Sequence, residues 1–501
     1  MSSTSPELGP SNAFLHVRVV DGRRVVDGVE TWTGGARVEH GGRRHGVWAS
    51  WEWDGERVRV SIDARAFFPL YYFASEREIC VAPNLLTLLE RGAPRVLDDD
   101  AIGVFLRLGT FLGDDTAFRA IRSVPACSRF EWHDGRLDVA RTRWRPTEVA
   151  LTREEAVDRY VEVFRQAMER RLVAEDEAFD LPMSGGADSR HILLELLSAG
   201  RCPRALVTAP QQLRSTDVEI ASRIAQRTGI EHIVVHGMLD DGWRAELRKN
   251  RTTNFCADEH VWYLPVADRL AATTRTTYDG VGGDILSAQL VLPERVVEAM
   301  RAHRVDEILD DVLTRVPERV LQHAVTPSFY ARIPPANARD RITDELRALL
   351  DMPNAWSMFF FLGGSRREIS LTPHATLAPL TVHTPFLDDD LVDLLAGLPP
   401  ELQLGGTLHA ETVARAFPEW RDVPYGRELP PPARLTQLGL KAARLPAHAA
   451  LHVRTHAVGP PSALLRRVPP VLGHPATPGT LGRFNRRAVW LRQLELLVSA
   501  A

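Results

Sequence analysis

The chain has 501 residues, of which 44% are hydrophobic and 25% are charged, and its net charge is −4. A single hydrophobic core stops growing beyond about 250–300 residues, so this length predicts two or three domains. Neither sign of charge dominates and no basic repeat is interleaved with aromatic residues, which argues against a nucleic-acid partner. The sequence shows no run of about eighteen apolar residues and no signal segment, so we expect no membrane span and a cytoplasmic location.

Cysteine usage excludes two further classes of protein. The four cysteines are scattered and form no Cys-x-x-Cys pair or Cys/His cluster, which argues against structural zinc and a disulfide framework. They are Cys80, Cys127, Cys202 and Cys256.

The first part of the chain, residues 1–148, predicts a β-rich domain. Segments 13–20, 46–53 and 58–62 are rich in β-branched and aromatic residues and are separated by Gly/Asp turns. From residue 149 to about 430 the pattern changes to alternating helices and strands, with helices predicted at 154–172 and 217–228 and strands at 205–209 and 232–236. This alternation of strands and helices indicates a parallel sheet with ligands at the carboxyl ends of its strands.

One stretch in the second domain predicts a phosphate-binding turn. Residues 184–189 read Ser-Gly-Gly-Ala-Asp-Ser, after a short apolar run and before a helix-period pattern. Gly185 and Gly186 leave the backbone N–H groups unobstructed, and the N-terminus of the following helix favours an anion. Ser184 and Ser189 add hydroxyl donors, while Asp188 offers a hard oxygen for Mg²⁺. The spacing and lysine of a Walker loop are absent.

A second glycine-rich stretch, residues 279–284, reads Asp-Gly-Val-Gly-Gly-Asp, and a third, 384–388, reads Thr-Pro-Phe-Leu-Asp. The chain resembles the asparagine synthetase superfamily in these two stretches and in three others. The others are the 184–189 stretch, the Pro-Leu-Tyr-Tyr segment at 69–72 and the Phe-x-x-Ile-x-x-Val-Pro segment at 118–125. That superfamily includes the β-lactam synthetases and lasso-peptide cyclases, and its loop is that of the N-type ATP pyrophosphatases.

The resemblance implies an Ntn-like β-sandwich of the α+β class followed by an α/β, adenine-nucleotide α-hydrolase-like (PP-loop) domain with a parallel sheet. The implied divisions are a degenerate class II glutamine amidotransferase-like domain at 1–148, an ATP-binding synthetase domain at 149–430, and a Pro-rich C-terminal extension at 431–501. The extension has ten Lys and Arg against one acidic residue. It could dock an acidic partner, or its helix at 484–497 could fold back on the core, which is the interpretation we favour.

The resemblance also implies site residues. ATP and pyrophosphate would be bound by Ser184, Gly185, Gly186, Asp188, Ser189, Val207, Gly280 and Gly282, and Mg²⁺ by Asp188 and Asp284. Val281 stands where the family has Glu or Tyr and cannot move a proton, so the base must lie elsewhere. The candidates are Glu259, His260, Glu368 and His374. For the catalytic cation the family uses Lys, and this chain offers Arg427, with Lys441 further on.

The resemblance implies an ATP-dependent amide-bond-forming ligase or cyclase that works through an acyl-adenylate and releases AMP and pyrophosphate. The glutamine-using members carry a cysteine after the initiator Met, where this chain has Ser2, Ser3 and Thr4. We therefore expect the amine to come from the substrate, which would be a small carboxylic acid or a peptide. A precursor peptide or a biosynthetic enzyme is a candidate partner. Two alternatives remain: a glutamine- or ammonia-dependent asparagine synthetase, and a non-catalytic nucleotide-binding protein.

Overall fold

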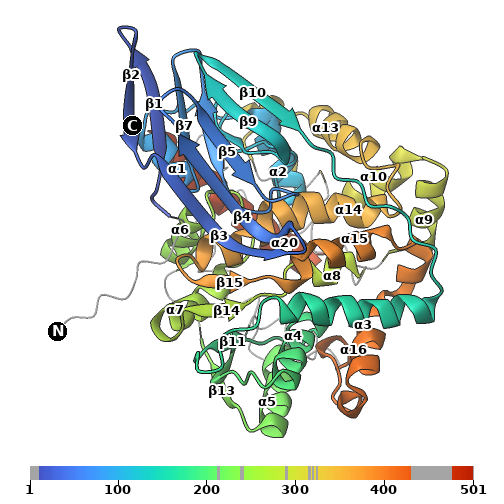
Figure 1. The fold of residues 1–501 in the computed structure, drawn as a ribbon. Helices are drawn as coiled ribbons and strands as arrows, with labels where there is room; N and C mark the ends of the chain where they lie inside the picture. The colour runs from blue at the N-terminus through green and yellow to red at the C-terminus, as the bar shows by residue number, and fades with distance from the viewer. Residues whose placement is uncertain are drawn as a thin grey trace.

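A computed structural model of the chain describes residues 11–210, 215–236, 242–287, 292–313, 318, 321–322, 325–429 and 477–499. Its first part forms two antiparallel sheets of five strands each, drawn in blue to cyan in Figure 1. The strand orders are β2-β1-β7-β6-β8 and β10-β9-β5-β4-β3. The strands are β1 (Leu15–Val20), β2 (Arg23–Gly28), β3 (Thr31–His40), β4 (Arg43–Trp53), β5 (Val58–Ile62), β6 (Tyr71–Ala74), β7 (Glu78–Ala82), β8 (Arg122–Ser123), β9 (Cys127–His133) and β10 (Arg136–Arg141).

Side chains from both sheets meet in one core, and β5 shows the alternation that this requires of a strand with one buried face. In β5 the buried residues are Val58, Val60 and Ile62, as expected for a strand with one face on a core. These side chains belong to the same buried cluster as Leu15 of the other sheet and Trp132 of β9. The helices of this part are α1 (Leu85–Glu90) and α2 (Asp99–Leu108).

The second part of the chain contains parallel strands. β11 (Asp180–Pro182), β12 (Ala205–Thr208) and β13 (Glu231–Val234) form a three-stranded parallel sheet, and β14 (Thr276–Tyr278) pairs with β15 (Thr381–His383), also in parallel. The hydroxyl of Thr277 donates to the carbonyl of Asp180 at 2.9 Å. The β14–β15 pair therefore lies beside β11, and the carboxyl ends of β11 and β14 are neighbours.

Helices make up most of the rest of this part of the chain (Figure 1). They are α3 (Arg153–Glu169), α4 (Ala187–Ser198), α5 (Thr216–Thr228), α6 (Gly242–Thr252), α7 (Leu264–Thr273), α8 (Gly283–Leu286), α9 (Glu294–Arg301), α10 (Val305–Leu313), α12 (Pro327–Arg332), α13 (Pro335–Arg347), α14 (Ala355–Phe360), α15 (Asp389–Gly397), α16 (Leu408–Ala416) and α20 (Thr477–Ser499). Shorter turns include the π-helical segments η2 (Phe361–Ile369) and η3 (Thr372–Thr376), and the 3-10 turns η1 (Val261–Tyr263), η4 (Pro385–Leu387), η5 (Pro400–Gly406), η6 (Pro418–Trp420) and η7 (Gly426–Glu428).

The helices and strands predicted in this part are confirmed, with small shifts at their ends. α3 begins at a capping box in which Thr152 and Glu155 satisfy each other's backbone N–H groups. It ends at Glu169, earlier than predicted, and the two arginines that follow it both bind Asp388. The predicted turn at 384–388 is also present, because the Asp388 side chain accepts from the N–H of Asp390 and caps α15.

Many contacts join the first part of the chain to the rest, and those of Arg65 and Phe105 are examples. Arg65, after β5, forms an ion pair with Asp389 and donates to the carbonyl of Leu387. The predicted C-terminal helix is present within α20, where Trp490 is buried and stacks on Phe105 with ring centroids 4.2 Å apart.

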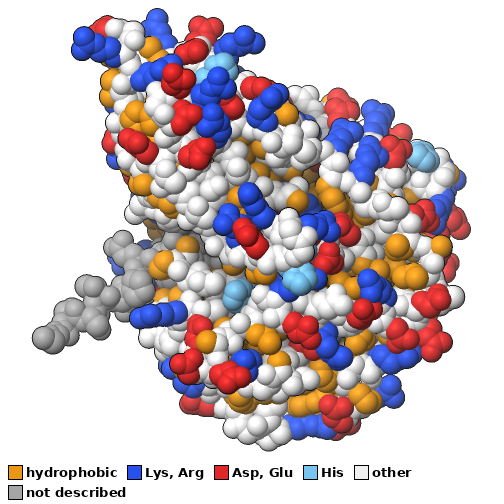
Figure 2. All heavy atoms as spheres, viewed as in Figure 1, with side chains coloured by type: hydrophobic (Ala, Val, Ile, Leu, Met, Phe, Trp, Pro, Cys, Tyr) orange, Lys and Arg blue, Asp and Glu red, His pale blue; other side chains and the backbone are white. Residues whose placement is uncertain are grey.

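The fold class is thus confirmed in its coarse form, as an antiparallel β region followed by an α/β region with parallel strands. Acidic and basic side chains are interspersed on the face shown in Figure 2. No helix of the described ranges is long and apolar enough to span a bilayer.

Candidate functional site

The Ser/Gly loop (residues 184–189) connects β11 to α4 and is held by hydrogen bonds of its own. The N–H of Ser184 donates to the Ser189 hydroxyl at 3.2 Å, and the N–H of Gly186 donates to the Ser184 hydroxyl at 3.2 Å. Gly186 is the N-cap of α4 and makes no side-chain cap hydrogen bond. No capping side chain therefore competes for the first-turn N–H groups of α4, which are suited to an anion.

A residue that the sequence did not indicate also binds this loop. The N–H of Gly185 donates to Asp217 Oδ1, in the first turn of α5, at 2.7 Å. This N–H is therefore already satisfied by a carboxylate. On the other side, the carbonyl of Gly185 accepts from the N–H of Gly426 at 2.8 Å.

The Gly/Asp loop (residues 279–284) follows β14 and lies directly against Asp188. A Cβ added to Gly283 would lie 2.6 Å from Asp188 Oδ1, and one added to Gly280 would lie 2.7 Å from the Asp188 Cβ. Gly282 has φ +95°, a conformation that favours glycine. The two loops that the sequence singled out, almost a hundred residues apart, therefore meet because Gly280 and Gly283 let the backbone approach Asp188.

The carboxyl groups that gather here lack a compensating cation. Burial, together with repulsion from Asp188, raises the pKa of Asp279 to about 6. Burial, followed by repulsion from Asp188, also raises the pKa of Asp284 to about 7. Asp284 is crowded by protein on the inner side of the loop but exposed to solvent, so water screens part of the repulsion. No arginine or lysine of the described residues forms an ion pair with Asp279 or Asp284.

The carboxylate oxygens of Asp188, Asp279 and Asp284 are suitable ligands for a hard cation, because Mg²⁺ prefers one or two carboxylates and keeps several waters. The ligand atoms of Asp188, Asp279 and Asp284 do not form a tight set, since the one group of three or more such atoms within 4.8 Å of one another among the described residues lies elsewhere. A cation would thus be held by Asp188 and Asp284 with water and phosphate oxygens completing its shell.

Two buried histidines lie behind Asp188, and sequence reasoning missed both. His409 of α16 places Nδ1 3.0 Å from Asp188 Oδ1, and its Nε2 is 3.1 Å from Nδ1 of His191 in α4. Burial, followed by the proximity of His409, lowers the pKa of His191 well below its usual range. Neither residue stands in a motif, so the sequence offered no signal for them.

The predicted cation Arg427 lies next to the Ser/Gly loop, since its neighbour Gly426 contacts Gly185. Its guanidinium donates to the carbonyl of Gly406 at 3.1 Å. Arg190 of α4 fixes this segment by donating to the carbonyls of Val423 and Pro424. Arg427 is exposed at this edge of the loop.

Two hydrophobic residues from the sequence interpretation are in the core. Val207 is 1% exposed, and its carbonyl accepts from the N–H of Met183 just before the Ser/Gly loop. Val281 is also buried, and its N–H donates to Asp279 Oδ1 at 2.8 Å. Any contact of Val207 with a ligand would therefore pass through its backbone.

The candidate bases form a separate acidic group near α20. Glu368 Oε1 accepts from the N–H groups of Asp258 and Glu259 at 3.1 and 3.2 Å. Burial, followed by repulsion from Asp258 and Glu259, raises the pKa of Glu368 to about 8. Glu259 is paired with Arg486 of α20 at 3.0 Å. The contacts described for Glu368 and Glu259 thus run to each other and to α20, and not to the Ser/Gly loop.

The two histidine candidates are neutral at pH 7. Burial lowers the pKa of His260 to about 4 and that of His374 to about 3. Lys441, the alternative cation, and the N-terminal hydroxyl residues Ser2, Ser3 and Thr4 lie outside the described residues.

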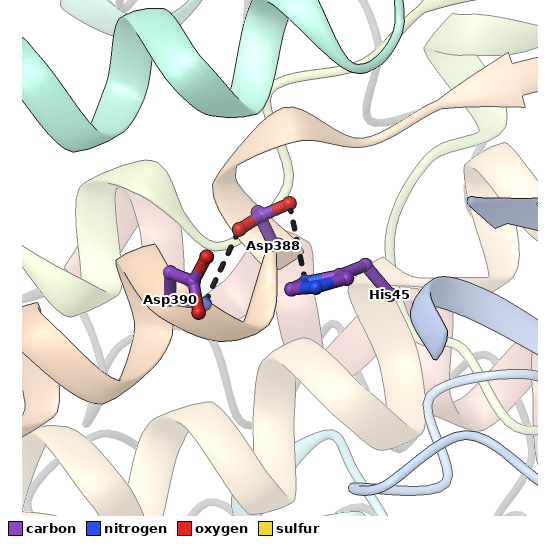
Figure 3. Close-up of side chains that lie close together, drawn as sticks. All are labelled: His45, Asp388 and Asp390. Carbon is purple, nitrogen blue, oxygen red and sulfur yellow. Dashed lines mark hydrogen bonds and ion pairs between the residues drawn. The ribbon is translucent and has the colours of Figure 1, made fainter. Parts of the chain in front are cut away.

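The tight set of three possible metal ligands is His45, Asp388 and Asp390 (Figure 3). His45 Nδ1 is 3.6 Å from Asp388 Oδ2. Each Asp388 oxygen, however, accepts from a guanidinium at 2.7 Å, one from Arg170 and the other from Arg171. Burial would raise the pKa of Asp388, but these arginines outweigh it and hold the pKa below its usual range. The cluster is an ion-pair network whose negative charge is already compensated, and a metal ion would be repelled by both arginines.

No protein-family model and no curated protein sequence matches this chain.

Proposed function

We propose that the protein is an ATP-dependent carbon–nitrogen ligase of the asparagine synthetase type, in which a PP-loop domain follows an Ntn-like sandwich. A substrate carboxylate oxygen attacks the α-phosphorus of ATP and the bond to pyrophosphate breaks. A substrate amine then attacks the acyl carbon of the adenylate, and AMP leaves. The product is an amide of a small molecule or peptide, and the amine does not come from glutamine.

One observation carries the proposal: Asp188 of the Ser/Gly loop meets the Gly/Asp loop at the carboxyl ends of two neighbouring strands. Ligands of open α/β sheets bind at such an edge. The carboxyl groups of Asp188 and Asp284 supply oxygens of the type that Mg²⁺ selects. The uncapped N-terminus of α4 supplies N–H groups of the type that phosphate selects.

The residues around the two loops have separate roles in this proposal. The first-turn N–H groups of α4 and the hydroxyls of Ser184 and Ser189 bind the pyrophosphate. Asp188 and Asp284 hold Mg²⁺, which when bound offsets the negative charge of the departing pyrophosphate. Arg427, beside the loop, offers charge to the α-phosphate. Glu368 and Glu259, whose described contacts run to each other and to α20, take no part in this proposal.

The test is exchange of labelled pyrophosphate into ATP, with Mg²⁺ and a panel of carboxylic acids that includes peptides. We expect exchange with at least one acid, and Asp188→Asn should reduce it by about 10²–10³-fold, as expected when charge stabilisation is lost. Asp390→Asn is the matched control, because it removes an aspartate from the ion-pair network instead. Equal exchange in wild type and Asp188→Asn would contradict the metal assignment.

A non-catalytic nucleotide-binding protein is the second candidate, and the contact between Gly185 and Asp217 favours it. A carboxylate at 2.7 Å already occupies one N–H of the loop and would repel pyrophosphate there. Mg²⁺-dependent ATP binding without exchange for any acid would establish this alternative. Separately, incubation with glutamine should release no glutamate, and release would contradict the proposal that the substrate supplies the amine.

A further inference from the structure

A line of buried polar groups runs from Asp188 into the protein. Asp188 Oδ1 is 3.0 Å from His409 Nδ1, His409 Nε2 is 3.1 Å from His191 Nδ1, and His191 Nε2 faces Glu195 Oε1 at 4.0 Å. Glu195 is in turn 3.2 Å from Nε of Arg165, which reaches solvent. The 4.0 Å separation of His191 from Glu195 is too long for a hydrogen bond, so the close contacts behind Asp188 are those of His409 and His191.

Both imidazoles are held in place by aromatic packing. His191 and His409 are 0% exposed. His191 stacks on Phe164 with centroids 3.9 Å apart, and His409 lies edge-on to Phe386 at 5.3 Å. Buried polar rings are unfavourable unless they are hydrogen-bonded, and an apolar residue would fill either position more simply. Their position directly behind Asp188 therefore calls for a role that an apolar residue cannot perform.

The contacts fix which nitrogen of His409 faces the carboxylate. Nε2 of His409 contacts Nδ1 of His191 at 3.1 Å, so Nδ1 is the ring nitrogen that lies 3.0 Å from Asp188 Oδ1. His191 therefore holds the His409 ring in the orientation that brings Nδ1 to the carboxylate.

We propose that His409 is a positioning residue that orients the Asp188 carboxylate for a divalent cation, and that His191 holds the His409 ring in place. This inference rests on the proposed function, since it gives Asp188 the role of metal ligand. Hydrogen-bonded groups behind a metal ligand commonly set its orientation and basicity, and their loss weakens metal binding by about 10–100-fold.

The test measures binding of Mn²⁺ alone to the full chain, from the loss of the free-ion electron paramagnetic resonance signal. His409→Phe retains the ring that packs on Phe386 but removes the donor, and it should raise the Mn²⁺ dissociation constant by about 10–100-fold. His409→Asn has an amide N–H close to the Nδ1 position and should recover most of the affinity. His191→Phe leaves His409 Nε2 without its partner and should have an intermediate effect.

His16→Phe is the matched control. His16 is also buried, at 3% exposure, and its Nε2 is 2.9 Å from a carboxylate oxygen of Glu78. It lies in β1 of the antiparallel region, so its loss should leave Mn²⁺ affinity unchanged. Urea unfolding of each variant separates loss of stability from loss of binding, and His409→Asn provides the answer if His409→Phe does not fold.

The outcomes distinguish this inference from the proposed function. If the wild type binds no Mn²⁺, both are overturned. If the wild type binds Mn²⁺ and His409→Phe binds it equally well, the positioning role is overturned and the proposed function is unaffected. An equal loss in His16→Phe would also overturn the positioning role, because the effect would then be general to buried histidines.

Discussion

Two groups of aspartates in this molecule have opposite electrostatic environments. Near the Ser/Gly loop, burial and mutual repulsion raise the pKa values of Asp279 and Asp284 to about 6 and about 7. At the start of α15, Asp388 is fully buried, yet Arg170 and Arg171 keep its pKa below the usual range. The side chains are the same, and only their neighbours differ.

This difference in neighbouring charges distinguishes an acidic cluster suited to a cation from one whose charge is already balanced. The tighter cluster, around Asp388, has its charge balanced by arginines and joins α3 to α15. The looser cluster, around Asp188 and Asp284, has an unbalanced negative charge at a solvent-accessible edge. A cation would relieve repulsion in the second cluster and would create repulsion in the first. Charge balance therefore favours the cluster around Asp188 and Asp284 as the proposed cation site, although its ligand atoms are less tightly spaced.

The largest effect is expected from Asp388→Asn. This change leaves the buried guanidiniums of Arg170 and Arg171 without their shared carboxylate, and it should lower the free energy of unfolding by about 3–5 kcal/mol. Urea denaturation monitored by circular dichroism measures the loss. Asp344→Asn is the control, because Asp344 is exposed and its pair with Arg347 should contribute at most about 1 kcal/mol. A loss below 1 kcal/mol for Asp388→Asn would show that the network is not structural.

Asp284→Asn should impair activity but should stabilise the metal-free protein, whereas Asp388→Asn should destabilise it. The Asp284→Asn change should reduce Mg²⁺-dependent exchange of pyrophosphate by about 10²–10³-fold. Without metal, however, the variant should be more stable than the wild type at pH 8, since the ionised carboxylate is disfavoured in the folded state. Thermal unfolding with and without Mg²⁺ measures both effects, and stabilisation of the variant by Mg²⁺ to the wild-type extent would refute the role of Asp284.

A smaller effect is expected from Gly283→Ala. The new methyl group would lie 2.6 Å from Asp188 Oδ1, so either Asp188 or the Gly/Asp loop must shift. We expect a loss of about 1–3 kcal/mol in stability and weaker Mn²⁺ binding. Gly364→Ala, where nothing lies within 4 Å of the added Cβ, is the control. Unchanged Mn²⁺ affinity in Gly283→Ala would show that the close approach of the two loops does not matter for binding.

Glu368 should make the stability of the protein depend on pH. Its folded-state pKa is about 8 against an ordinary 4.5, so folding favours the protonated acid. The stability that this group contributes is fully present below pH 4.5 and is lost as the pH rises to about 8. Glu368→Gln should therefore flatten the dependence of unfolding free energy on pH between these limits. An unchanged pH dependence would place the titration elsewhere.

Local sequence signals predicted the elements because those elements depend on local chemistry. The predicted strand at 58–62 coincides with β5, and the predicted helix at 217–228 lies within α5. The 184–189 and 279–284 stretches were also singled out from their glycines and acidic residues alone. The role proposed for them remains a prediction.

The tertiary structure decided the environment of each of those residues. His409 contacts Asp188 although more than two hundred residues separate them in the sequence. Asp217 of α5 accepts a hydrogen bond from the N–H of Gly185. Asp388 and Asp284 are both aspartates beside a helix N-terminus, and nothing local distinguishes them. The pKa of Asp388 is lowered because Arg170 and Arg171 donate hydrogen bonds to it, whereas burial and the nearby charge of Asp188 raise that of Asp284. Coulomb interactions depend on distance in space, which a linear pattern of residues does not contain.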